Sequence, residues 1–341
     1  MNTKNNNQKR FTLNDIAELS GVSKTTVSMV LNGRADEFRI KEETRQKILQ
    51  IATNNRYRAN LYAKALQSQR TNTIGLVIPD FSNFGFAQTS KTLERLCRNH
   101  GLQLIISCSD EEPHLEAKAI ESLLERQIDL LITTPICQNQ KDYPYLDSIP
   151  TIQLDRFIKD APHIPYVITD DQSAVEALVS DMICKYRLDE FYYFGGLLQL
   201  TPSEARLQGF KCGLQQGGLT LQTDWISHRD YHSESGYLMM EQLLQRLGRL
   251  PQAIFVASYG LLVGVLRFLN ERQLLDQLSN QTLHLATFDD YELLNCLPFK
   301  INSIRQQHDQ IANELFASIL NILEKKPVEN KTIAAKLCWR D

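Results

Sequence analysis

The stretch from Phe11 to Leu31, which reads FTLNDIAELSGVSKTTVSMVL, constrains the fold of this chain more than any other. Four apolar residues in its first half recur at helical spacing: Leu13, Ile16, Ala17 and Leu19. Gly21 interrupts that run, because glycine adopts backbone angles that other residues resist. Ser23 then offers a hydroxyl that can cap a second helix, with Val27, Val30 and Leu31 on its inner face. A helix, a glycine turn and a capped helix form the pattern of a helix-turn-helix.

The second helix of this pattern would present polar side chains at its N-terminal end, the end that enters a DNA major groove. Asn32 and Gly33 follow it and predict its end, since both residues tolerate left-handed backbone angles. Helix pairs with an intervening glycine also occur in proteins that do not bind DNA, so the rest of the chain has to decide. A third helix is expected at residues 41–55, which would let three short helices enclose a small core.

The charge of the chain is distributed unevenly along its 341 residues, although the net charge is only -3. Through Arg70 there are thirteen Lys and Arg against six Asp and Glu, while the remainder is acidic. A basic segment joined to an acidic body suits a protein that touches phosphate at one end. A solvated charge bias without a partner is the alternative. Residues 57–72 are polar, would form only a short marginal helix, and are expected to act as a linker.

Several features of the sequence favour a cytoplasmic protein. The seven cysteines include no CxxC pair, as expected for free thiols in a reducing compartment. The N-terminal MNTKNNNQKR is too polar for a secretory signal, and no apolar run is long enough for a membrane span. The seven histidines are dispersed without ligand spacing, so we expect no metal, no cofactor and no catalytic residues.

From Thr73 onward, strands and helices alternate, which predicts an open α/β sheet. Strands are expected at 73–79, 103–108, 129–133 and 151–154, and again at 190–195, 253–257 and 284–288. Helices are expected at 87–100 and 113–126, and in a second set at 171–185, 203–216, 233–247, 259–271 and 308–324. The pattern restarts after about Ile164, so two α/β lobes are expected. Ligands of such sheets bind where the strands end.

Polar and aromatic side chains follow these strands. The residues expected to contact a small ligand are Phe84, Asp110, Asp155, Arg156, Arg206, Ser258, Tyr259 and Asp289. Arginine offers forked donors to phosphate or vicinal hydroxyls, and aspartate accepts from hydroxyls, so this set suits a polyol with or without a phosphate. Ordinary loop chemistry, in which Asp caps helices and Arg forms surface pairs, is the alternative for any one of these residues.

The chain resembles the lactose-repressor/galactose-repressor family of bacterial transcription regulators over essentially its whole length. The resemblance rests on TLNDIAELSGVSKTTVSMVLNG, YRANLYAKAL, IGLVIPDFSN, LDR at 154–156 and RLQGF at 206–210. Within the family it resembles sucrose operon repressors and fructose repressors, on NGRADEFRI, TPSEARLQGF, YHSESGY and LATFDDYELL.

The resemblance implies an all-α helix-turn-helix headpiece at 1–58, a hinge helix at 59–71 that folds on DNA, and a two-lobed core at 72–341. That core is an α/β effector-binding and dimerisation unit like a periplasmic binding protein, with parallel sheets. It also implies a homodimer on double-stranded operator DNA, with no membrane association. Lys24, Thr25 and Met29 match major-groove readers, and Leu66 matches a minor-groove wedge. The full set expected to contact DNA is Thr12, Ser23, Lys24, Thr25, Thr26, Ser28, Met29, Asn32, Arg34, Tyr57, Asn60, Ala63 and Leu66.

Three positions depart from the family pattern. Met29 stands where arginine is common, so its base contacts would be apolar. Ala59 replaces the usual proline before the hinge, and Ser258-Tyr259 replaces a common Asn-Asp pair. No heptad repeat ends the chain, so a C-terminal tetramerising coil is not expected.

The sequence therefore predicts a repressor of sucrose or fructose utilisation genes, released from a near-palindromic operator by fructose or a fructose phosphate. A fructose-type catabolite repressor/activator is the alternative within the family. A sugar-binding transport protein would need a signal peptide and would lack the headpiece. An enzyme is not expected, because no GxGxxG, P-loop or nucleophile elbow is present.

Overall fold

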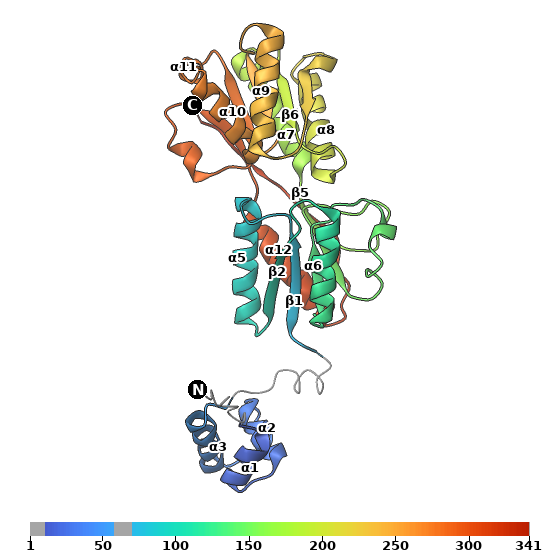
Figure 1. The fold of residues 1–341 in the computed structure, drawn as a ribbon, viewed down its shortest axis with the longest axis vertical. Helices are drawn as coiled ribbons and strands as arrows, with labels where there is room; N and C mark the ends of the chain where they lie inside the picture. Colours follow the sequence, from blue (N-terminus) through green and yellow to red (C-terminus); the bar gives the residue numbers. More distant parts are fainter. Residues whose placement is uncertain (1–10, 58–69, 341) are drawn as a thin grey trace, which may run out of the picture. The chain divides into compact units, whose positions relative to one another are not determined.

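Three short helices form the first unit of the protein (Figure 1). The structure is a computed structural model that describes residues 11–57 and 70–340. The chain divides into two units, residues 1–71 and 72–341. The helices of the first unit are α1 (Leu13–Ser20), α2 (Lys24–Leu31) and α3 (Glu42–Asn54).

The turn between α1 and α2 follows the predicted pattern. Gly21 ends α1 in the left-handed region at φ 73°, and Ser23 caps α2 by accepting from the Thr26 amide at 3.1 Å. One prediction on α1 is wrong: Leu19 is 57% exposed rather than part of the apolar stripe. Ser20 continues the i, i+3, i+4, i+7 spacing instead, and its buried hydroxyl donates to the Ile16 carbonyl at 2.6 Å.

The first unit closes around a small apolar core. Its buried residues are Ile16, Val27, Val30, Ala35, Ile48 and Ala52. Lys47 of α3 donates to the Ser20 carbonyl at 2.9 Å, which satisfies one of the free carbonyls that end α1. Packing against α1 and α3 therefore holds α2 in one orientation, with its polar side outward.

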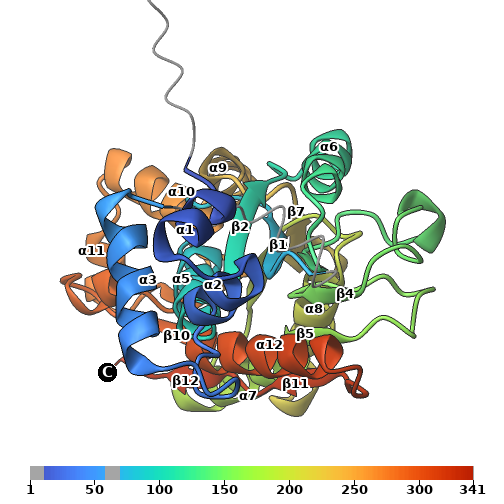
Figure 2. The same ribbon diagram turned by 90° about the horizontal axis from the view of Figure 1, so that it is seen from below.

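The second unit begins with a six-stranded sheet whose neighbouring strands all run parallel. Its order is β11-β5-β4-β3-β1-β2. The strands are β1 (Thr73–Ile78), β2 (Gln103–Cys108), β3 (Leu130–Thr133), β4 (Thr151–Leu154), β5 (Tyr166–Thr169) and β11 (Lys331–Ile333). α6 (Pro113–Glu125) covers one face, while α5 (Phe84–Asn99) and α12 (His308–Leu323) pack together on the other (Figures 1 and 2). This sheet and its helices form the first lobe.

The second lobe repeats this plan in the order β12-β10-β9-β8-β6-β7, with only β12 antiparallel to its neighbour. Its strands are β6 (Tyr192–Gly195), β7 (Ile226–His228), β8 (Ala253–Val256), β9 (His284–Phe288), β10 (Ile301–Arg305) and β12 (Lys336–Cys338). Its helices are α7 (Asp171–Tyr186), α8 (Thr201–Gln216), α9 (Ser233–Leu247), α10 (Tyr259–Glu271) and α11 (Asp276–Ser279). The fold class predicted from the sequence is confirmed.

The chain passes between the lobes three times, after β5, after β10 and after β11. This connectivity corrects one prediction, because helix 308–324 was grouped with the second lobe. Ile311, Leu315 and Ile319 of α12 pack in the first-lobe core with Leu93 of α5. Sequence order alone suggested the wrong grouping, since the chain returns to the first lobe after β10.

Candidate functional site

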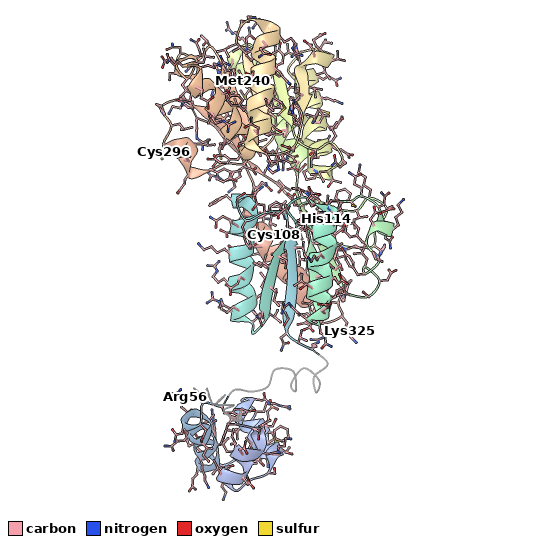
Figure 3. The ribbon with its side chains drawn as sticks, viewed as in Figure 1. Arg56, Cys108, His114, Met240, Cys296 and Lys325 are labelled. Atoms are coloured by element: carbon pink, nitrogen blue, oxygen red, sulfur yellow. The ribbon has the colours of Figure 1, made fainter. Side chains whose placement is uncertain are left out.

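Strand ends of both lobes meet at a cavity of ≈ 390 Å³ within the second unit. Cys108, the last residue of β2, and His114, in the first turn of α6, mark the edge of the first lobe that faces the second (Figure 3). Seven of the eight residues predicted for ligand binding line the cavity: Asp110, Asp155, Arg156, Arg206, Ser258, Tyr259 and Asp289. The geometry therefore brings together side chains that lie up to 179 positions apart in the sequence, from Asp110 to Asp289.

Three of the carboxylates in the cavity are placed by left-handed backbone at the strand ends. Asp110, Asp155 and Asp289 have φ values of 49°, 64° and 74°. Aspartate tolerates this region better than most residues, because its short side chain bonds locally. The chain turns sharply at such a residue just after the strand and leaves its carboxylate near the sheet edge.

Arg156 is already paired. Its two terminal nitrogens donate to both carboxylate oxygens of Glu111 at 2.7 and 2.6 Å, and its Nε lies 3.7 Å from Asp155. The guanidinium is buried, with 6% of the side chain exposed. Glu111 was not among the predicted site residues, although it directly follows Asp110 after the second strand.

Arg206 reaches the cavity from the second turn of α8. It donates to the Ala257 carbonyl at 2.8 Å, and its guanidinium carbon lies 3.6 Å from the centre of the Phe288 ring. Its Nε lies 3.5 Å from Asp171. Burial raises the pKa of the Asp171 carboxyl to about 7, against the opposing effect of the Arg206 charge. Asp171 was also missed by the sequence analysis, since it reads as an ordinary residue of a helix start.

Three buried polar atoms in this region have no hydrogen-bond partner among the described residues: Arg156 Nε, Arg206 Nε and Asp171 Oδ1. Buried polar groups are normally satisfied, so such atoms call for an explanation. Arg156 and Arg206 line the cavity, so hydroxyl groups of a ligand would be acceptors for their Nε atoms, whereas Asp171 is not among the lining residues. The set of atoms therefore fits a polyol better than an apolar ligand.

Aromatic rings form another part of the site and belong to both lobes. Phe84, the eighth predicted residue, is not among the residues that line the cavity, and it is 44% exposed. Its ring lies 5.0 Å from that of Tyr291, which in turn lies 3.8 Å from that of Tyr259. Phe84 begins α5 in the first lobe, whereas Tyr259 and Tyr291 belong to the second. Tyr291 was not predicted, because nothing in its local pattern distinguishes it from a loop residue.

Residues at the crossings between the lobes also reach the cavity. Thr169 at the end of β5 donates to the Gln306 side chain at 2.7 Å. Gln306 in turn donates to Asp289 at 2.8 Å. Two crossing segments are thus linked to a cavity carboxylate through one amide side chain. His308, at the start of α12, also lines the cavity, and burial lowers its pKa, which favours the neutral ring.

The first unit presents the residues predicted for DNA contact on and around α2. Lys24 and Thr25 are exposed in its first turn, while Thr26, Ser28 and Met29 are partly buried. The hydroxyls of Ser23 and Thr26 lie 2.9 Å apart, so part of their hydrogen-bonding capacity serves the cap. Lys24 and Thr25 therefore have the most freedom to meet a partner.

Other predicted DNA contacts also have structural partners. Thr12 caps α1 in a reciprocal arrangement with Asp15, and Asn32 donates to Ser28 at 3.2 Å. Arg34 forms an exposed ion pair with Glu37 at 2.7 Å, of a kind that opens at little cost. Tyr57 packs against the core of the first unit. The remaining predicted contacts, Asn60, Ala63 and Leu66, lie outside the described residues, as does the expected hinge helix up to residue 69.

Comparison with known families matches both units. Residues 12–60 match the family described as bacterial regulatory proteins, lacI family. Residues 185–341 match the periplasmic binding protein-like domain. Among the described residues, no helix is both long enough and apolar enough to cross a membrane.

Individual relatives match over most of the chain. A sucrose operon repressor of Klebsiella pneumoniae is 41% identical, over 94% of this chain and 95% of that protein. A crystal structure of the Cra transcriptional dual regulator from Pseudomonas putida, in complex with fructose 1-phosphate, is 30% identical with a TM-score of 0.71. It covers 79% of this chain and 99% of that one. The lac repressor dimer bound to operator shares the fold, with a TM-score of 0.84 at 20% identity, over 97% of this chain and 98% of that one.

Proposed function

Because this chain belongs to the lacI family of bacterial regulatory proteins, we propose that it represses sucrose or fructose utilisation genes. It would bind a near-palindromic operator as a homodimer and leave it when fructose or a fructose phosphate enters the cavity. Residues 1–58 would be the headpiece, 59–71 the hinge, and 72–341 the effector-binding and dimerisation core. The observation that carries this proposal is the presence, in one chain, of a helix-turn-helix unit and a cavity rich in carboxylates and arginines.

The chemistry of the cavity supports a sugar as the effector. The hydroxyls of a sugar would donate to Asp155 and Asp289 and accept from Arg206, whose Nε has no hydrogen-bond partner among the described residues. Tyr259 and Tyr291 offer ring faces for the apolar side of a pyranose or furanose. The similar protein from Klebsiella is named a sucrose operon repressor, and the similar structure from Pseudomonas contains fructose 1-phosphate. Both relatives support fructose or its phosphate as the candidate.

The surface of the headpiece supports the DNA side of the proposal. Lys24 and Thr25 are exposed at the N-terminal end of α2, where a recognition helix meets base edges. Met29 would offer an apolar contact, such as to a thymine methyl group. The excess of basic residues before Arg70 would add affinity for phosphates that does not depend on sequence.

The proposal is tested with a duplex that the purified protein selects from a random pool. Binding of the labelled duplex is followed by fluorescence anisotropy during titration with fructose, fructose 1-phosphate or sucrose. We expect tight binding without sugar and release by fructose or its phosphate, with no turnover of any sugar. Selection of no duplex, or a selected duplex that none of the sugars releases, would contradict the proposal.

A fructose-type catabolite regulator that also activates transcription is the second candidate. The Pseudomonas relative is described as a dual regulator, and it covers most of the core unit. The two candidates share the site and differ in their target genes, so the positions of the selected duplexes relative to promoters distinguish them. A sugar transport protein gains no support from the three-helix unit, and the similarity to transcription regulators favours a protein that is not an enzyme.

A further inference from the structure

The ion pair between Arg156 and Glu111 occupies the arginine that an anionic ligand group would need. Both terminal nitrogens of the guanidinium donate to the carboxylate, at 2.7 and 2.6 Å. This two-point geometry is also how arginine holds a phosphate. Glu111 therefore sits where an anionic group of a ligand would make its strongest contact.

The backbone holds Glu111 in this position. Asp110 and Glu111 are consecutive non-glycine residues in the left-handed region, at φ 49° and 59°. The turn is fixed on both sides, since Asp110 donates to the Pro79 carbonyl at 2.8 Å and Glu112 donates to that of Ser109 at 2.9 Å. Two strained residues in succession are sparse in proteins and concentrate at functional sites. The loop thus presents one carboxylate to Arg156 rather than leaving it free in solvent.

The other cation of the cavity is also engaged. Among the described residues that line the cavity, the only arginines or lysines are Arg156 and Arg206. Arg206 is held by the Ala257 carbonyl, the Phe288 ring and Asp171. The carboxylates of Asp80, Asp155 and Asp289 also line the cavity. A sugar phosphate therefore meets excess negative charge, and the two-point contact that arginine can give a phosphate is open to it at Arg156 only if it displaces Glu111.

We propose that Glu111 is an intramolecular competitor for Arg156 and sets how well the protein discriminates between a sugar and its phosphate. This inference rests on the proposed function and names a determinant of its effector class. A neutral sugar binds beside the intact pair, with its hydroxyls on Asp155, Asp289 and Arg206. A phosphorylated sugar has to displace the Glu111 carboxylate, and part of its binding free energy is spent on that exchange.

Replacement of Glu111 by glutamine tests the competition. Glutamine keeps the shape and one acceptor oxygen, but it removes the negative charge and the second contact. The dissociation constants for fructose and fructose 1-phosphate are measured by calorimetry on the full-length wild type and on Glu111→Gln. We expect fructose 1-phosphate to bind about tenfold more tightly to the variant, since a charged two-point contact is roughly twice as strong as a neutral one. The dissociation constant for fructose should change by no more than about twofold.

Two further variants separate competition from a structural role. Glu112→Gln makes the same chemical change at the next residue, whose side chain is 59% exposed and outside the cavity, and it should change neither constant. In the double variant Glu111→Gln/Arg156→Gln the gain for fructose 1-phosphate should disappear, because the gain depends on a freed Arg156. If Glu111→Gln instead binds both sugars more weakly by the same factor and melts at a lower temperature, the pair between Glu111 and Arg156 only holds the loop.

The two proposals fail in different ways. If the wild type binds at least one sugar and Glu111→Gln leaves the ratio of the two constants unchanged, the competitor role is wrong and the proposed function stands. If wild-type protein binds neither sugar and neither releases the selected duplex, the proposed function itself is wrong.

Discussion

Arg206→Lys is the substitution that most directly separates sugar recognition from folding. Alanine would leave the Asp171 carboxylate and the Ala257 carbonyl without their partner in a buried site, so a loss of response could simply reflect unfolding. Lysine keeps a positive charge near Asp171 and removes the planar fork. The variant therefore changes the geometry of donation while it preserves the charge.

The contacts of Arg206 give the size of each effect. The lost hydrogen bond from the charged guanidinium to Ala257 costs about 1.5–3 kcal/mol, and the lost stacking on Phe288 costs about 1–2 kcal/mol. The free energy of unfolding should therefore fall by about 2.5–5 kcal/mol at most, since lysine keeps part of the charge interaction, and urea unfolding shows whether the variant stays folded. A hydrogen bond from a charged donor to a sugar hydroxyl contributes about 1.5–3 kcal/mol. Loss of one such bond from the fork raises the dissociation constant about 10- to 150-fold.

The assay combines urea unfolding with anisotropy on the selected duplex. Arg206→Lys should bind the duplex like the wild type and need about 10- to 150-fold more sugar for half-release. Arg272→Lys is the matched control, because Arg272 caps α10 in the same lobe, is 56% exposed and lies outside the cavity. Release of Arg206→Lys at the wild-type sugar concentration would refute the placement of Arg206 in the effector site.

Three further predictions concern pH, salt and the hinge. Because burial raises the pKa of Asp171 from 3.8 to about 7, its contribution to the free energy of unfolding should fall as pH rises through that window. Urea unfolding at pH 5 and pH 7.5 should show a smaller fall for Asp171→Asn, and an equal fall would contradict the assignment. Neutralising Arg34, Arg56 and Arg58 together should lower the slope of log affinity against log salt by about one per lost phosphate contact, and weaken all duplexes alike. An unchanged slope would remove these arginines from the interface. Leu66→Ala should weaken specific duplex binding strongly and leave the sugar affinity of the free protein unchanged, and amides of residues 59–67 should gain exchange protection only on the duplex. Equal protection without DNA would refute a hinge that folds on binding.

The sequence was most informative where local chemistry determines local structure. Gly21 and Ser23 encode the turn of the helix-turn-helix, and the apolar run 73–78 encodes a buried parallel strand. Five strands were not predicted: β5, β7, β10, β11 and β12. Three of them, β7, β11 and β12, are three-residue strands at sheet edges, whereas the five residues of β10 lie inside the second-lobe sheet between β9 and β12. β5 is only partly buried on alternate residues, and β11 and β12 have three residues each, too few to show a period.

The candidate site could be predicted only as far as side chains follow strand ends. Asp289 and Asp290 are adjacent and equivalent in the sequence, yet only Asp289 lines the cavity. Asp290 turns away into ion pairs with Arg305 and Arg340. The partners Glu111 and Asp171 were missed for a related reason, because pairing across loops depends on the tertiary fold. The assignment of α12 failed because a crossing between lobes leaves no local signal.

The most direct test of sugar-controlled DNA binding is the reciprocal coupling between the two ligands. Fructose, or fructose 1-phosphate if it binds more tightly, is titrated by calorimetry into free protein and into protein saturated with the selected duplex. Thermodynamic linkage requires DNA to weaken sugar binding by the same factor by which sugar weakens DNA binding. We predict a weaker sugar affinity on the duplex, by the factor measured in the release experiment. Equal sugar affinity in both states would contradict the claim that the cavity controls operator binding.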